Sequence, residues 1–182
     1  MHPSSLHIVP FKDADPKAIY ILLSRLSLRF KELTIEMPVP LPEEAYNSKR
    51  GQWDGERILR FLREMKKEKN MEWVLGVTSS DLYSGSLNFI FGIASLGGGE
   101  ALISTHRLRE GAGEKEYLSR ILKEALHELG HNMGLEHCEN PTCVMHFSNS
   151  LSDTDRKKDE FCYKCRLSLP KWFSSESFKR FW

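Results

Sequence analysis

Residues 127–137 read HELGHNMGLEH, which fits the pattern H-E-x-x-H-x-x-G-x-x-H. The first two histidines, His127 and His131, are four residues apart, so on a helix both imidazoles project from one face. Gly134 can adopt a positive φ, which ends the helix and turns the chain so that His137 returns toward the other two. Three neutral imidazoles can hold zinc and leave one coordination position open for water. The stretch therefore predicts a catalytic zinc site built on a helix.

Glu128 directly follows the first expected ligand. Zinc lowers the pKa of a bound water from about 15.7 to about 7, and a neighbouring carboxylate can take the proton of that water. We therefore expect Glu128 to be the general base. The alternative is a polar helix whose histidines face solvent, but three of the seven histidines fall at ligand spacing, which disfavours it.

Met145 follows His137 by eight residues, within the run CVMHF at residues 143–147. A histidine triad followed by such a methionine is the Met-turn pattern of the metzincins. The methionine is expected to lie beneath the zinc as an apolar floor and not to bind it. The alternative is an ordinary core methionine, because methionine fills gaps in many cores.

The cysteines form two close pairs with the spacing C-x4-C, a gap of eighteen residues, and C-x2-C: Cys138, Cys143, Cys162 and Cys165. Such spacing is typical of a tetrahedral structural zinc site. Two disulfides are the alternative, but no secretion signal is visible, and the cytosol keeps thiols reduced. A redox pair of Cys162 and Cys165 is a third possibility, but no thioredoxin-like βαβ pattern surrounds it.

The run from His127 to Cys165 resembles the archaemetzincins, whose signature joins the long zinc motif to C-x4-C-x-M and a later C-x-x-C. The three histidines, Glu128, the methionine and the four cysteines all match that signature. One departure from the family pattern is expected in the loop between Met145 and Cys162, which is one residue shorter, a change that loops tolerate. Other stretches that look like family residues are Arg50 to Asp54, Leu87 to Gly92, Ser104, Arg107-Leu108, Phe147 to Ser150 and Asp155.

This resemblance implies a compact α/β metzincin-like metalloprotease domain, with a twisted mixed sheet, backing helices and an active-site helix. An upper subdomain would span residues 1–134, and a smaller lower subdomain around the four-cysteine zinc site would span residues 135–182. Together they would form a single catalytic domain that binds two zinc ions. The implied activity is peptide-bond hydrolysis by a zinc-activated water. The alternative is a weakly active or non-catalytic zinc-scaffolded module that binds peptides.

Composition supports an ordinary globular protein of 182 residues, with 40% hydrophobic and 28% charged residues. A net charge of +1 gives no reason to expect a nucleic-acid or membrane partner. The expected substrate is a peptide or unfolded protein. We expect a cytoplasmic monomer, because neither a signal peptide nor an apolar run long enough to span a bilayer is visible.

Hydrophobic spacing predicts strands alternating with helices, and hence an α/β layer architecture. The first expected helix starts at Asp15-Pro16. Two further helices are expected over residues 54–69 and 114–132, and the last of these carries the zinc ligands. The expected strands are residues 6–10, 33–37, 73–77, 87–94 and 101–105. The basic outer face of the helix at 54–69 is expected to be solvated. By the resemblance, residues 87–94 would be the edge strand along which an extended peptide lies.

Several weaker expectations concern the region after the motif. Phe147 stands where some metzincins carry a tyrosine, and its ring has no hydrogen-bond donor. His146 could reach inward in its place, or be a surface or supporting histidine. Acidic and amide side chains at 149, 153 and 155 could brace a ligand, although turn and helix-cap roles are more usual. The charged run 153–160 should be solvated, and the aromatic tail after residue 166 should pack on the domain or serve as a docking patch.

Overall fold

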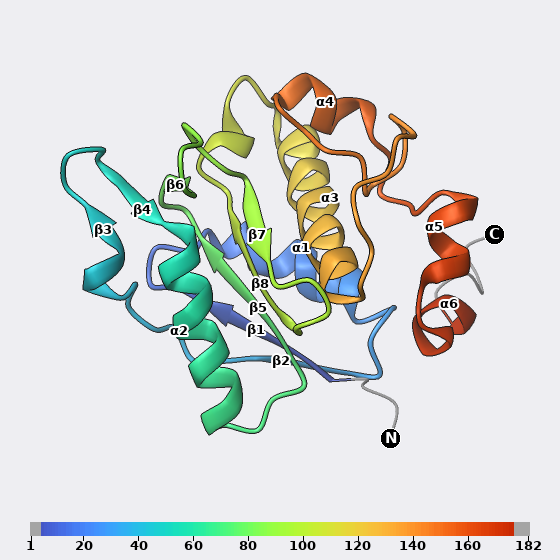
Figure 1. Cartoon of the computed structure of the whole chain (residues 1–182), viewed down its shortest axis with the longest axis horizontal. Helices are drawn as coiled ribbons and strands as arrows, with labels where there is room; N and C mark the ends of the chain where they lie inside the picture. Colours follow the sequence, from blue (N-terminus) through green and yellow to red (C-terminus); the bar gives the residue numbers. More distant parts are fainter. Residues whose placement is uncertain (1–4, 177–182) are drawn as a thin grey trace.

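A five-stranded sheet forms the frame of the protein in the computed structural model, which describes residues 5–176 (Figure 1). Four of its strands are parallel, and the last is antiparallel to its neighbour and lies at the edge. In spatial order the strands are β2 (Glu32–Ile35), β1 (Ser5–Pro10), β5 (Trp73–Thr78), β8 (Glu100–Ser104) and β7 (Gly92–Ala94). Every residue of the central β5 is buried, as is usual for parallel strands covered on both faces.

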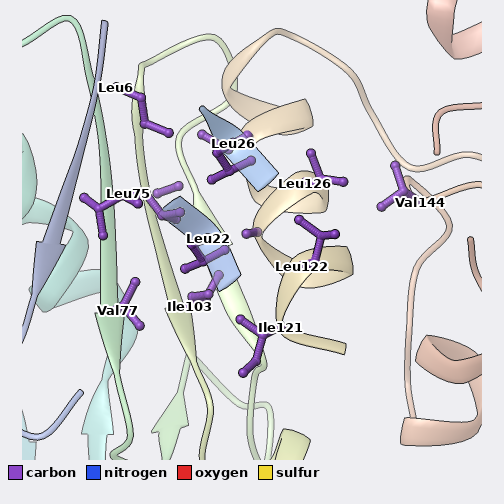
Figure 2. Close-up of a cluster of buried hydrophobic side chains, with 14 of the residues drawn as sticks. Leu6, Leu22, Leu26, Leu75, Val77, Ile103, Ile121, Leu122, Leu126 and Val144 are labelled. Atoms are coloured by element: carbon purple, nitrogen blue, oxygen red, sulfur yellow. The ribbon is translucent and has the colours of Figure 1, made fainter. Parts of the chain in front are cut away.

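Helices cover both faces of the sheet. Helices α1 (Pro16–Leu26) and α3 (Glu114–Asn132) pack on one face, and α2 (Gly55–Glu68) packs on the other. Asp15 and Asp54 cap α1 and α2 by accepting hydrogen bonds from backbone N–H groups of the first turn. Alternating strand residues divide between two cores, so that Leu75 packs toward α1 and α3 while Val74 packs toward α2. Figure 2 shows the first of these cores between the sheet, α1 and α3.

A second, three-stranded sheet lies beside α2. It consists of β3 (Tyr46–Asn47), β4 (Gln52–Asp54) and β6 (Leu82–Tyr83). Short 3₁₀ turns precede β3 and follow β8: η1 (Glu43–Ala45) and η2 (Arg107–Arg109). Between β6 and the edge strand β7, the chain passes through residues 84–91, which we call the rim loop.

After α3 the chain runs without helix or strand over residues 135–150, all within the described range, and then forms three short helices. These are α4 (Leu151–Arg156), α5 (Tyr163–Ser168) and α6 (Lys171–Glu176). Two side chains of α3 hold α4 in place: the guanidinium of Arg120 donates to both carboxylate oxygens of Asp155, at 2.7 and 2.8 Å, and the Lys123 ammonium donates to the carbonyls of Thr154 and Asp155. Residues on both sides of residue 134 share one core, and the division into two subdomains there stays a prediction.

The predicted α/β architecture is confirmed, and α3 has the bounds that its hydrophobic spacing predicts. The predicted strand at 87–94 is wrong over most of its length, because only Gly92–Ala94 pair with β8. Its first part instead forms the rim loop, in which the Leu87 N–H donates to the Ser84 carbonyl in a turn. No helix of the described chain is both long and apolar enough to cross a membrane.

Two charged segments are less exposed than predicted. In the run 153–160, Thr154 and Lys157 are buried against the body of the protein. On α2, Arg63 and Lys66 form ion pairs with the buried carboxylate of Glu100 at 2.7 and 2.9 Å. Tertiary contacts thus bury Lys157 and pair Arg63 and Lys66 with a buried carboxylate, where sequence alone predicts solvated charges.

The start of the aromatic tail packs on the domain, which is the first of the two expectations for it. Phe173 is fully buried, and Trp172 lies 5.8 Å from Phe30 and 5.9 Å from Trp73 between ring centroids. The remaining tail aromatics, Phe178, Phe181 and Trp182, lie outside the described residues.

The pair Arg120–Asp155 makes stability depend on pH. The hydrogen bonds from Arg120 lower the pKa of Asp155 in the folded state. Its stabilisation is therefore complete above the unfolded pKa of about 3.9 and is lost as pH falls through the lower, folded value. We expect Asp155→Asn to cost about 2 kcal/mol at pH 7, because the nearly buried Arg120 loses its charged partner. The difference from wild type should shrink as the pH falls below about 3.9.

Urea unfolding of both proteins at pH 7 and pH 3 measures this difference. Glu64→Gln, in an exposed pair with Lys67, is the matched control and should change stability by less than about 0.5 kcal/mol. Equal losses for the two variants would contradict a special role for the buried pair.

Candidate active site

Helix α3 presents His127 and His131 from one face, and a backbone carbonyl orients each ring. The Nδ1 of His127 lies 2.8 Å from the Val144 carbonyl oxygen, and the Nδ1 of His131 lies 2.7 Å from that of Leu135. A carbonyl can only accept, so each Nδ1 carries the proton and each Nε2 keeps a free lone pair. The two Nε2 atoms face each other at 3.1 Å.

His137 joins them because the chain turns at Gly134, whose φ is +87°. Its ring centroid lies 5.4 Å from that of His127 and 4.9 Å from that of His131. One ligand atom from each of the three histidines lies within 4.8 Å of the others. In a tetrahedral zinc site with Zn–N of about 2.05 Å, ligand nitrogens are about 3.3 Å apart. The three rings therefore fit a zinc ion.

The surroundings keep these imidazoles neutral, as metal binding requires. Burial, followed by the positive charge of Lys157, lowers the pKa of His127 well below its ordinary value. Burial also lowers the pKa of His131, and burial together with Lys157 lowers that of His137. Free lone pairs are therefore available at neutral pH.

Glu128 is buried on the same helix and lies against the edge strand. A Cβ added to Gly92 of β7 would sit 2.7 Å from its Oε1 and 2.8 Å from its Cγ. Burial, and then the charge of Glu124, raise the pKa of Glu128 well above the ordinary value. Glu124 is itself buried one turn earlier, and burial raises its pKa against the lowering effect of Lys157.

A cavity of about 430 Å³ opens in front of the histidines. The rim loop and β7 form one wall, while α3 and the segment after Met145 form the others. Its lining comprises Ser84, Leu87, Asn88, Phe89, Ile90, Phe91, Gly92, Ile93, Ala94, Glu124, His127, Glu128, His131, His137, Phe147, Ser148, Asn149 and Lys157. The arrangement places three imidazoles and a carboxylate in the wall of a largely apolar cleft.

Lys157 and Glu124 are the cavity residues that sequence reasoning missed. Lys157 is 2% exposed, and its Nζ donates to the His146 carbonyl at 3.0 Å. Burial lowers the pKa of Lys157 below its ordinary value, although the charges of Glu124 and Glu128 act in the opposite direction. A lysine within a mixed-charge run carries no sequence signal of burial. Glu124 lies four residues before Glu128, and this spacing is the one available signal that the two share a helix face.

Met145 is fully buried and packs against α3 at Gly130. A Cβ added to Gly130 would lie 2.3 Å from its Sδ, so glycine at that position lets the methionine approach the helix. The Cys138 N–H donates to the Met145 carbonyl at 2.9 Å. Met145 therefore lies against the helix that carries His127 and His131, and its place beneath a zinc ion stays a prediction.

The weaker expectations divide. His146 does not line the cavity, and its Nδ1 lies 2.8 Å from the Cys138 carbonyl. Phe147 does line it, with its ring centroid 4.9 Å from that of His137. Asp153 has a capping role, since it forms a reciprocal capping box with Ser150 at the start of α4. Of the three residues considered as braces, Asn149 lines the cavity and Asp155 binds Arg120.

All four cysteines come together as free thiols next to the segment that carries His137 and Met145. The Sγ atoms of Cys138 and Cys162 are 3.7 Å apart, as are those of Cys143 and Cys165. With Zn–S of about 2.3 Å, a tetrahedral site separates its sulfurs by about 3.8 Å, so the cluster fits zinc. Burial would raise the pKa of Cys162. Hydrogen bonds to its sulfur, of which the strongest comes from the backbone of Cys165, outweigh burial and lower the pKa to about 7. This favours at Cys162 the thiolate form that metals bind, whereas burial raises the pKa of Cys143 and Cys165.

Comparison with known proteins identifies the group to which these features belong. The model of peptidase family M54 matches residues 22–171. The archaemetzincin of Pyrococcus furiosus is 48% identical over 138 residues, covering 73% of this chain and 72% of the relative. That of Methanocaldococcus jannaschii is 43% identical over 167 residues, covering 89% and 90%.

Solved structures agree. The archaemetzincin of Archaeoglobus fulgidus, crystallised with malonate, superposes with a TM-score of 0.82 at 37% identity and covers 91% of this chain and 99% of that one. The archaemetzincin of Methanopyrus kandleri gives a TM-score of 0.80 at 39% identity, covering 97% and 96%. The fold and the metal-binding groups thus define a zinc metallopeptidase. The chain belongs to peptidase family M54, which confirms the resemblance seen in its sequence.

The close approach of Glu128 to Gly92 yields a prediction. A methyl group at residue 92 would displace the carboxylate, and a misplacement of about 1 Å can cost about 100-fold in rate. We expect Gly92→Ala to lower peptide turnover roughly 10- to 100-fold while zinc content stays unchanged. Turnover assays and elemental analysis of the same preparations measure both quantities. Gly113→Ala, where an added Cβ meets open space, is the control; full activity of Gly92→Ala would contradict this role for the contact.

Proposed function

We propose that this protein hydrolyses peptide bonds in the cavity, with His127, His131 and His137 holding the catalytic zinc and Glu128 acting as general base. The observation that carries the proposal is the convergence of three neutral imidazoles beside a buried carboxylate. A zinc ion bound there would supply a Lewis acid and make a water molecule acidic enough to ionise near neutral pH. The monomeric state and the cytoplasmic location stay predictions.

Glu128 is suited to move the proton that hydrolysis must transfer. Burial and the neighbouring charge of Glu124 raise its pKa, so this carboxylate takes up a proton more readily than an exposed glutamate does. The carboxylate takes a proton from water as the carbonyl is attacked and then gives it to the leaving amine. Contact with Gly92 and the burial of Glu124 behind it hold the carboxylate at one position in the cavity wall.

The outer edge of β7 is where we place the main chain of the peptide. The Phe91 carbonyl accepts from Ser104 N–H of β8, and the Ser95 N–H donates to Glu100. In an antiparallel ladder these groups alternate, so the N–H and C=O groups of Gly92 and Ala94 point to the open side. An extended peptide can pair with them and pass in front of Glu128. Leu87, Phe89 and Phe147 make the adjoining walls apolar and favour apolar substrate side chains.

The experiment that tests this function is mass-spectrometric detection of cleavage across a diverse peptide mixture. We expect the zinc-loaded wild type to give products and Glu128→Gln, which keeps the shape but cannot take a proton, to be at least about 100-fold slower. Glu139→Gln, at an exposed position, is the control and should behave as wild type. An absence of products from the zinc-loaded wild type would overturn the proposal and favour a non-catalytic module that binds peptides, an outcome that the lack of a donor on Phe147 leaves open.

We propose further that the four cysteines hold a second, structural zinc that stabilises the segment carrying His137 and Met145. The hydrogen bond from Cys138 N–H to the Met145 carbonyl links the two sites. Elemental analysis should find about two zinc ions per chain, one for each ligand set. Cys143→Ser should reduce this to about one and lower thermal stability. Full zinc content in that variant would count against the second site.

A further inference from the structure

Three stretches that mark the family resemblance include none of the reacting groups described above, yet side-chain contacts connect them around Asp81. These are Arg50 and Gln52 on the β3–β4 hairpin, residues 87–91 in the rim loop, and Arg107 after β8. They are far apart in sequence. We call Arg50, Gln52, Asp81 and Arg107 the Asp81 network.

The side-chain amide of Gln52 is at the centre of the network and is 8% exposed. Its Nε2 donates to Asp81 Oδ2 and to the Asn88 carbonyl, each at 2.9 Å. Its Oε1 accepts from Arg50 Nε, also at 2.9 Å. Both amide hydrogens and the amide oxygen are therefore engaged, so the residue can be neither shortened nor charged without loss.

The side chain of Arg50 binds main-chain carbonyl groups of the rim loop. Its Nη2 donates to the carbonyls of Leu87 and Asn88 at 2.8 and 3.1 Å. Its guanidinium lies over the Tyr83 ring, 4.2 Å from the centroid. Because these interactions use three directions of one planar group, a lysine ammonium cannot reproduce them.

Arg107 completes the network from the other side. It donates from Nε and Nη2 to the two carboxylate oxygens of Asp81, both at 2.8 Å. Its guanidinium also lies over the ring of Phe89, 4.3 Å from the centroid. The Phe89 ring in turn packs on Phe91 with the centroids 5.2 Å apart. Both phenylalanines line the cavity.

Within the rim loop, strand-like pairing forms at Ile90, whose N–H donates to the Leu82 carbonyl, and side chains of the network bind the main chain at Leu87 and Asn88. The carbonyl oxygens of Leu87 and Asn88 accept hydrogen bonds from the side chains of Arg50 and Gln52, so we do not expect them to pair with a peptide. The rim therefore contributes side chains to the cavity, while main-chain pairing with a peptide is limited to β7.

Resting on the proposed function, we infer that the Asp81 network positions the rim loop as a substrate-binding wall, with Arg50 and Gln52 as positioning residues for peptide binding. None of the four side chains lines the cavity itself, so the network acts through Leu87, Asn88 and Phe89. Loss of the network should weaken substrate binding and leave the reacting groups in place.

Steady-state kinetics on a peptide that the wild type cleaves, combined with amide hydrogen exchange, tests this role. Arg50→Met should raise KM about 10-fold and keep kcat within about twofold, the pattern expected when binding but not chemistry is lost. Amide exchange over residues 84–91 should become faster, while zinc content stays at the wild-type value. Arg50→Lys should lie between the two proteins, and it replaces Arg50→Met if that variant fails to fold.

Gln52→Glu tests the same network with an isosteric side chain. It would put a carboxylate against Asp81 and the Asn88 carbonyl, so we expect a similar rise in KM. Arg60→Met is the control, because Arg60 is exposed on α2 and does not line the cavity.

An unchanged KM in Arg50→Met and Gln52→Glu, with or without a fall in kcat, would overturn the inference. Exchange in the rim loop that matches the Arg60→Met control would also overturn it. A wild type that cleaves no peptide would instead count against the proposed function, and hydrogen exchange would still decide whether the network holds the rim.

Discussion

The hydrogen bond between His127 Nδ1 and the Val144 carbonyl joins the active-site helix to the segment that follows it, and much of the site depends on it. It orients the ring and fixes which nitrogen keeps a lone pair. It also brings Val144 and Met145 under α3, where Gly130 leaves room for the methionine. Val144 N–H in turn donates to Glu160, so the same segment is tied to the chain leading to the second cysteine pair. The two metal-binding groups are therefore parts of one connected structure.

The electrostatics of the cleft follow from how deeply α3 is buried. All residues from Arg120 to Gly130 on this helix are buried, including Lys123, Glu124, His127 and Glu128. Charges in such a place need partners. Lys157 supplies a positive charge near the two glutamates, and Arg120 finds Asp155 on α4. The same contacts that neutralise buried charge also attach the smaller C-terminal elements to the helix.

The edge strand β7 has two constraints that oppose each other. In the proposed function it stays open for a peptide, while a three-residue strand holds few hydrogen bonds of its own. The rim loop that leads into it is ordered by side chains from the small sheet and from η2, while the groups of Gly92 and Ala94 that point away from β8 remain available.

The sequence by itself determined the local chemistry. His127 and His131 are four residues apart, and side chains with that spacing share one face of any α-helix. The hydrophobic periodicity around them predicts the bounds of α3 correctly. The paired cysteine spacing likewise predicts a cluster that forms in space. What only the tertiary structure decided is the set of contacts between segments far apart in the chain: Lys157 buried beside Glu124, the rim loop in place of a strand, and the network around Asp81. No local pattern reports these, because the burial of a charged side chain or the pairing of a strand depends on which partner the fold brings to it.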